Sequence, residues 1–202
     1  MRRIGITGGI GSGKSVVSRL LRIMGYSVYD TDSEAKRLME SSLEVVQKLS
    51  ECFGRDIYHN GRLNRGLLSS RVFGESDKIV LLNSIVHPVV RFDFYRWSES
   101  LNEEICFVES AILYESRFDE LVDEVWTVTA PEELRIGRVR QRSGLTEEEI
   151  KKRMAAQLSE EEKQRRAAHI IWNDGNVSVI HRVLSLLLSL IHISEPTRLR
   201  RI

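Results

Sequence analysis

A glycine-rich segment near the start of the chain carries the residue types that bind phosphate groups. The segment Gly8-Gly9-Ile10-Gly11-Ser12-Gly13-Lys14-Ser15 has the pattern G-x-x-x-x-G-K-S. Glycines permit backbone torsions that turn successive N–H groups towards one anion, and a lysine at this spacing reaches the β- and γ-phosphates. The hydroxyl of the next serine is a Mg²⁺ ligand in such loops. We therefore expect a P-loop that binds ATP and Mg²⁺, with Ser15 as the metal ligand and ATP contacts from Gly9, Gly11, Ser12, Gly13, Lys14, Ser15 and Val16.

Two aspartates come directly after the next hydrophobic run. Asp30-Thr31-Asp32 ends the β-like segment Ser27–Asp30, and ligands of open parallel sheets sit beyond the carboxyl ends of the strands. One carboxylate could orient or deprotonate an acceptor hydroxyl, as an aspartate does in other kinases. Asp32 could equally cap a helix that begins at Ser33, because aspartate is a favoured N-cap residue. The residues alone leave both interpretations open.

Arginines gather at the end of a predicted helix that stops before Gly144. Arg138 and Arg142 are four residues apart and share one face, and Arg153 lies on the next helix. Basic side chains stabilise the C-terminal end of any helix, which is one explanation. Arginines that fold over phosphates also stabilise the charge of a transferring phosphoryl group. The pattern therefore indicates a helical lid at about residues 138–160.

The hydrophobic pattern predicts a scaffold of strands that alternate with helices. A strand at Arg3–Thr7, a helix at Lys14–Met24 and the strand Ser27–Asp30 form a βαβ unit, which implies a parallel sheet with helices on its faces. Strands resume later in the chain at Glu104–Glu109, Glu124–Val128 and His169–Asn173. We predict an α/β fold of the P-loop NTPase class, with three α/β/α layers around a five-stranded parallel sheet.

Between the two groups of strands lies a stretch with helical patterns and no convincing strand. We expect helices at Ser33–Met39, Glu44–Phe53, Arg65–Val72, Ser76–Val86 and Pro88–Leu101. Such a stretch inside an α/β chain indicates an inserted helical domain that binds the acceptor. We assign residues 33–102 to this insertion, residues 1–32 and 103–191 to the kinase core, and residues 192–202 to a non-native or disordered tail.

Signals for four more helices follow the fourth strand. Pro131 suits the first turn of a helix that runs to about Arg142. Thr146 with Glu149 forms a capping-box pattern. Ser159 with Glu162 repeats it, and an apolar helix closes the chain.

Composition narrows the class of protein. The 202 residues carry a formal charge of +1, which argues against a general nucleic-acid binder. No apolar run reaches the ~20 residues of a membrane span, and Cys52 and Cys106 lack zinc-ligand spacing. A cytoplasmic enzyme is the default expectation.

The sequence motifs also narrow the class of P-loop protein. A switch GTPase is disfavoured because no aspartate has a glycine three residues later and no Asn-Lys pair occurs. The class that remains is a small phosphotransferase.

Several segments in a fixed order resemble the dephospho-coenzyme A kinase family over roughly residues 3 to 185. The opening Ile6 to Ser15 is similar to the family's opening almost residue for residue, and Asp30-Thr31-Asp32 falls at its D-x-D. The other similar segments are Gly61 to Arg65, Val72-Phe73, Leu82 to Pro88, Glu109 to Glu115, Gln141-Arg142, Arg153 to Gln157 and Asn173. Two positions depart from the pattern, Ala111 and Val16, and both changes leave the implied chemistry intact.

The resemblance implies ATP-dependent phosphorylation of the ribose 3′-hydroxyl of dephospho-coenzyme A, the last step of coenzyme A synthesis. It implies catalytic roles for Asp32, Lys14 and Arg142, and it places Arg138 and Asn173 at ATP. The acceptor would meet Asp32, Arg65, His87 and Glu109. ATP and dephospho-coenzyme A would be the only partners, with no nucleic acid or membrane, and the chain would be a monomer or weak homo-oligomer. The alternatives are another P-loop small-molecule or nucleoside monophosphate kinase, and a non-catalytic nucleotide-binding module.

Overall fold

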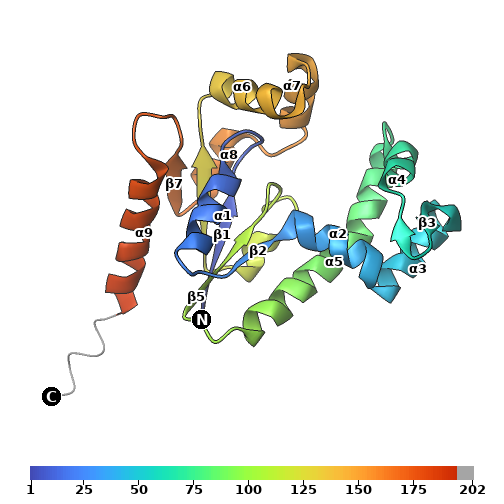
Figure 1. Cartoon of the computed structure of the whole chain (residues 1–202), viewed down its shortest axis with the longest axis horizontal. Helices are drawn as coiled ribbons and strands as arrows, with labels where there is room; N and C mark the ends of the chain where they lie inside the picture. Colours follow the sequence, from blue (N-terminus) through green and yellow to red (C-terminus); the bar gives the residue numbers. More distant parts are fainter. Residues whose placement is uncertain (195–202) are drawn as a thin grey trace. The chain divides into compact units, whose positions relative to one another are not determined.

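A sheet built from distant parts of the chain carries the phosphate-binding segment. The structure, a computed structural model, describes residues 1–194. Its strands are β1 (Arg2–Thr7), β2 (Val28–Asp30), β5 (Ile105–Glu109), β6 (Glu124–Thr129) and β7 (His169–Trp172). They are arranged in the order β2-β5-β1-β6-β7, and β1–β5, β1–β6 and β6–β7 pair in parallel (Figure 1). The predicted P-loop fold with a five-stranded parallel sheet is confirmed.

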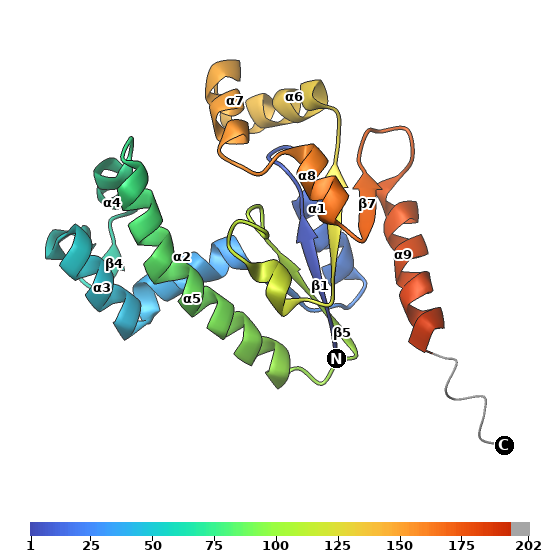
Figure 2. The same cartoon turned by 180° about the vertical axis from the view of Figure 1, so that it is seen from behind.

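Strand β6 is buried on both faces because helices cover both. On one face, Trp126 and Val128 of β6 pack in a core with α1 (Lys14–Ile23) and α9 (Val179–Ser194). The intervening residues Thr127 and Thr129 face the other side, where they bind α8 (Glu160–Arg166). Figures 1 and 2 show α1 and α8 on opposite sides of the sheet. This alternation along one strand produces the three layers.

The insertion forms a compact unit of its own. The described chain divides into Tyr29–Glu103, called here the insertion unit, and a core unit of Met1–Val28 with residues 104–194. The helices of the insertion unit are α2 (Thr31–Ser41), α3 (Leu43–Phe53), α4 (Arg65–Val72) and α5 (Ser76–Ser100), with a 3-10 turn at Arg55–Ile57.

A short hairpin in the insertion unit was not predicted. Strands β3 (Tyr58–His59) and β4 (Arg62–Leu63) pair antiparallel around Asn60 and Gly61. Both turn residues have positive φ, 50° and 75°. Asn-Gly is the strongest short signal for such a turn, so the expectation of no strand here overlooked an available signal.

Pro88 does not break the long helix, so the predicted division into two helices is wrong. Helix α5 runs through Pro88 for 25 residues. Proline inside a helix costs about 3 kcal/mol locally. Buried side chains on both sides of it, Ile85, Val86, Val90 and Phe94, hold the two halves in one direction. Tertiary packing therefore outweighs the local preference.

The later helices match their signals closely. Helix α6 (Glu132–Ser143) ends at Gly144 with φ 66°, and Pro131 is its N-cap residue rather than part of its first turn. Helix α7 (Glu147–Ala155) has the full capping box of Thr146 and Glu149. Ser159 caps α8 through the N–H of Glu162.

The last described element is the helix α9. The predicted tail begins at residue 192, whereas α9 continues to Ser194, and residues 195–202 lie outside the described part. Within residues 1–194, no helix has the length and hydrophobicity needed to cross a membrane.

Candidate active site

The phosphate loop joins β1 to α1 in a conformation that requires its glycines. Gly8, Gly11 and Gly13 have φ values of 146°, 79° and 101°. A Cβ on Gly8 would lie 2.1 Å from the backbone oxygen of Val128, and one on Gly13 would lie 2.1 Å from Asn173 Nδ2. Gly13 is also the N-cap of α1 and supplies no side chain to its first N–H groups. These N–H groups and the helix dipole are therefore directed to an anion.

Lys14 and Ser15 begin α1 beside the loop. Lys14 Nζ donates to the backbone oxygen of Gly8 at 2.8 Å, which folds its ammonium back over the loop. Ser15 and Val16 lie on the exposed side of the first turn. Among the residues described, no cluster of three or more His, Cys, Asp or Glu side chains could hold a metal by itself. An exposed Ser15 hydroxyl beside an anion-binding loop fits a cation that is shared with nucleotide phosphates.

Two residues predicted to bind ATP hold the loop by its carbonyl groups. Asn173 Nδ2 donates to the Ser12 backbone oxygen at 2.8 Å. Arg138 donates to the Gly11 oxygen at 3.4 Å and to the Asn173 oxygen at 2.8 Å. These contacts fix the conformation of the loop around Gly11 and Ser12. The structure thus brings Arg138 and Asn173 to the P-loop itself.

Three further residues support the loop and were absent from the predicted site. Gln157 Oε1 accepts a hydrogen bond from the Ile10 N–H at 3.0 Å. Arg135 and Glu160 form an ion pair at 3.3 Å directly against Gly9, where an added Cβ would lie 2.2 Å from Glu160 Oε1. The sequence did give a signal for Gln157, because this residue ends a segment that resembles the family. No local pattern identified the ion pair, because its partners lie on separate helices.

The ion pair belongs to a larger cluster of charges under the loop. Lys163 has no exposed side-chain area and lies 3.9 Å from Glu115. Burial lowers the pKa of Lys163, Glu115 and Glu160 oppose that shift, and Arg135 adds to it. The two cations and two carboxylates balance in charge, which is the condition for keeping ions in an interior. The base of the phosphate loop is therefore ionic.

The two aspartates of the D-x-D segment differ in their contacts. The carboxylate of Asp30 caps a helix, whereas that of Asp32 has no hydrogen bond in the described chain. Asp30 is the N-cap of α2, and its Oδ1 accepts from the N–H groups of Asp32 and Ser33 at 3.0 and 3.2 Å. Asp32 lies in the first turn and is exposed, and its carboxylate accepts no hydrogen bond from any described residue. The interpretation of Asp32 as the N-cap is therefore wrong, because Asp30 fills that position.

The cap predicts a stability effect at Asp30. Asp30→Ala removes the acceptor of two backbone N–H groups and should lower the free energy of unfolding by about 1 kcal/mol. Urea denaturation followed by circular dichroism measures this. An unchanged midpoint for Asp30→Ala would contradict the assignment of the cap, and Asp30→Asn, which keeps the acceptor, serves as the matched control.

The remaining predicted site residues lie on four elements. Arg142 is exposed near the end of α6, and its side chain makes no hydrogen bond or ion pair within residues 1–194. Arg65 of α4 pairs with Glu40 at 3.1 Å. His87 is half-buried on α5, and burial followed by the charge of Arg91 lowers its pKa. Glu109 is half-buried at the end of β5.

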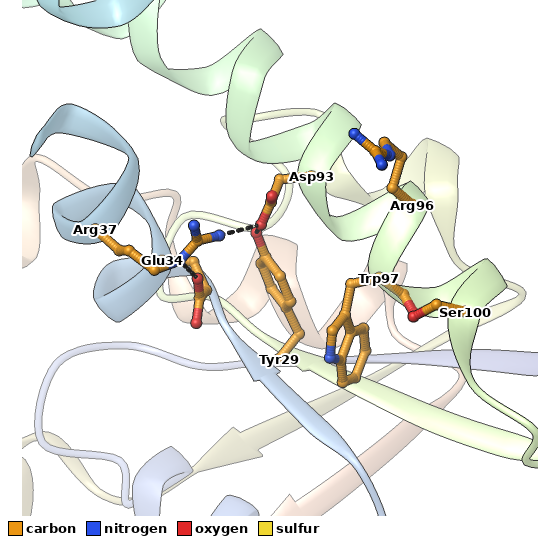
Figure 3. A pocket seen from close by; sticks show the side chains of 7 residues that line it. All are labelled: Tyr29, Glu34, Arg37, Asp93, Arg96, Trp97 and Ser100. Atoms are coloured by element: carbon orange, nitrogen blue, oxygen red, sulfur yellow. Dashed lines mark hydrogen bonds and ion pairs between the residues drawn. The ribbon is translucent and has the colours of Figure 1, made fainter. Parts of the chain in front are cut away.

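A polar pocket in the insertion unit is organised by one buried tyrosine (Figure 3). It has a volume of about 490 Å³ and is lined by Tyr29, Glu34, Arg37, Asp93, Arg96, Trp97 and Ser100. The Tyr29 hydroxyl donates to Asp93 at 2.7 Å, and Arg37 donates to the same oxygen at 2.8 Å. Burial, then the bond to Asp93 and its charge, raise the pKa of Tyr29. These contacts join β2 and α2 to α5, so the pocket's polar groups stabilise the fold of the unit.

The tyrosine contact gives a second stability prediction. Tyr29→Phe should lower the free energy of unfolding by about 1.5–3 kcal/mol, because Asp93 loses one of its two donors. Urea titration of the purified variant measures the change. A variant as stable as the parent chain would show that this hydrogen bond does not stabilise the insertion unit.

Comparison with known proteins identifies the family. The family profile for dephospho-CoA kinase matches residues 2–178. A dephospho-CoA kinase from Bacteroides fragilis is 41% identical over 186 residues, which cover 92% of this chain and 91% of the relative. One from Porphyromonas gingivalis is 45% identical over 80% of both chains. A crystal structure of a Thermus thermophilus protein superposes with a TM-score of 0.82 at 37% identity, covering 94% of this chain and 97% of that one.

The resemblance inferred from motif order is confirmed by these matches. The matched residues include the phosphate loop, the insertion unit, helices α6 to α8 and Asn173. The chain therefore belongs to the dephospho-CoA kinase family.

Proposed function

We propose that this chain transfers the γ-phosphoryl group of ATP to the ribose 3′-hydroxyl of dephospho-coenzyme A. The observation that carries the proposal is the phosphate loop, which Asn173 and Arg138 hold by hydrogen bonds. This loop lies in a chain that matches the family over residues 2–178. The products are coenzyme A and ADP. An oxygen–phosphorus bond forms to the acceptor, and the bond between the γ-phosphorus and the β,γ-bridging oxygen breaks.

The phosphate loop binds the triphosphate in this proposal. Asn173 and Arg138 hold the carbonyl oxygens of Ser12 and Gly11, and thereby keep the loop in the conformation that would bind the anion. Lys14 lies over the loop, where its ammonium meets the β- and γ-phosphates. Ser15 holds Mg²⁺, which neutralises charge on the phosphates when it is bound. Arg142, exposed on α6, supplies a further positive charge to the transferring group.

Asp32 receives the proton of the acceptor hydroxyl. Its carboxylate is exposed and is engaged by no hydrogen bond in the described chain. Asp30 caps the helix, so α2 does not need the Asp32 carboxylate in order to form. Arg65, His87 and Glu109 complete the proposed acceptor contacts.

An acceptor panel tests the function. Purified chain with ATP and Mg²⁺ should release ADP, measured by a coupled assay, when dephospho-coenzyme A is added. Shikimate, nucleosides and nucleoside monophosphates should give background rates. Turnover of another panel member in place of dephospho-coenzyme A would reassign the substrate. ATP binding with no turnover of any acceptor, in a folded sample, would favour a non-catalytic binding module.

The remaining properties stay predictions from the sequence. They are a cytoplasmic location, no nucleic-acid partner, and a monomeric or weakly associating chain. Light scattering coupled to size-exclusion chromatography over a range of concentrations measures the last of these.

A further inference from the structure

A lysine with no exposed side-chain area lies under the segment that follows β5. Lys163 projects from α8, and its Nζ donates to the backbone oxygen of Ala111 at 3.4 Å. The same Nζ lies 3.9 Å from Glu115 Oε1. Ala111 and Glu115 both belong to the turn that follows β5. One ammonium therefore ties this turn to α8.

Glu115 continues the connection towards the phosphate loop. Its Oε1 also accepts from the Leu158 N–H at 2.7 Å, in the turn between α7 and α8. The preceding residue is Gln157, whose Oε1 accepts from the Ile10 N–H in the phosphate loop at 3.0 Å. Four residues thus form a continuous path from the buried ammonium to the loop.

Stability alone does not require an ammonium at this position. Burying a lysine is unfavourable unless carboxylates compensate it, and apolar residues of similar volume are often at least as stabilising. Methionine would fill much of the same space without that cost. Unlike methionine, the ammonium can fix the position of the turn after β5, because it attracts one carboxylate oxygen and one carbonyl oxygen of that turn.

We propose that Lys163 and Glu115 are positioning residues for the phosphate loop: the ammonium holds Glu115, Glu115 holds the Leu158 N–H, and Gln157 is thereby kept on Ile10. This inference rests on the proposed kinase function, since its readout is the use of ATP. Lys163 has no exposed side-chain area with which it could contact a substrate. Their effect reaches ATP through the backbone of the loop, whose N–H groups bind phosphate only when correctly oriented.

The test uses Lys163→Met, Glu115→Gln and the double variant in the full chain. Glu115→Gln keeps an acceptor for Leu158 and removes the charge that Lys163 attracts. Each single variant should lower kcat/KM for ATP by about 10- to 100-fold, and should weaken binding of a non-hydrolysable ATP analogue measured by calorimetry. The double variant should lose about as much as one single variant, because both changes interrupt the same path.

The matched control is Arg165→Met, which removes a positive charge from the exposed side of the same helix. It should keep the parent values of kcat/KM and analogue affinity. Glu115→Gln carries the test if Lys163→Met does not fold. The proposal is overturned if the folded variants use ATP like the parent chain, if only their melting temperatures fall, or if the two losses simply add. Turnover of dephospho-coenzyme A by the parent chain is measured in the same experiment as the variants. It tests the proposed function separately from the roles of Lys163 and Glu115.

Discussion

Asp32→Asn is expected to lower kcat by about 10²- to 10⁴-fold, the usual contribution of a positioned general base. The amide keeps the size of the carboxylate and cannot accept the proton of the ribose hydroxyl. KM for ATP should change little, because Asp32 belongs to the acceptor side of the proposed reaction. Thermal stability should also stay close to the parent value, since Asp30 caps α2 and the Asp32 carboxylate accepts no hydrogen bond within residues 1–194.

Steady-state kinetics with both substrates varied measures this effect. Asp77→Asn is the matched control, because Asp77 is an exposed carboxylate in the first turn of another helix of the insertion unit. The control should leave kcat unchanged. Parent-like kcat in Asp32→Asn would remove the aspartate from the proposed chemistry. A large loss of stability would instead indicate a structural role that the contacts do not show.

Lys14→Met should lower kcat/KM for ATP by about 10²- to 10³-fold, as removal of one preorganised positive group from a transferring oxyanion does. The methionine keeps the apolar stem and removes the ammonium that lies 2.8 Å from the Gly8 oxygen. Because negative charge builds up on the β,γ-bridging oxygen as its bond to the γ-phosphorus breaks, kcat should fall more than ATP affinity. Single-turnover measurements at saturating ATP separate the two effects.

Lys48→Met provides the comparison for this change. Lys48 is exposed on α3 and forms a surface ion pair with Glu44, which is worth at most about 1 kcal/mol. Its replacement should leave both kcat and KM unchanged. If Lys14→Met transferred phosphate at the parent rate, the loop would bind phosphate in a way that does not use the lysine.

The fold could be predicted well because its strongest signals are local. The phosphate loop needs positive-φ glycines at fixed spacing, and the structure uses Gly8, Gly11 and Gly13 in this way. Capping residues likewise act within one helical turn, so the starts of α7 and α8 agree with their signals. Pro88 shows the limit of local rules, because buried neighbours along α5 outweigh the proline.

The support of the site could be predicted only in part. Arg138 and Asn173 were identified, yet their contacts with the backbone of Gly11 and Ser12 depend on how α6 and β7 approach the loop. The cluster formed by Arg135, Glu160, Lys163 and Glu115 joins two helices and a turn. In the sequence these residues are ordinary charges among many. Only burial, which is a property of the folded chain, distinguishes Lys163 from Lys151 on the surface of α7.

Identification of the phosphorylated atom tests the central claim most directly. The purified chain is incubated with ATP, Mg²⁺ and dephospho-coenzyme A, and the product is examined by phosphorus NMR and mass spectrometry. The account predicts a product with one added phosphoryl group, attached as a monoester at the ribose 3′-oxygen and identical to coenzyme A. A product phosphorylated at another position, or unchanged dephospho-coenzyme A with a folded and ATP-binding chain, would contradict it.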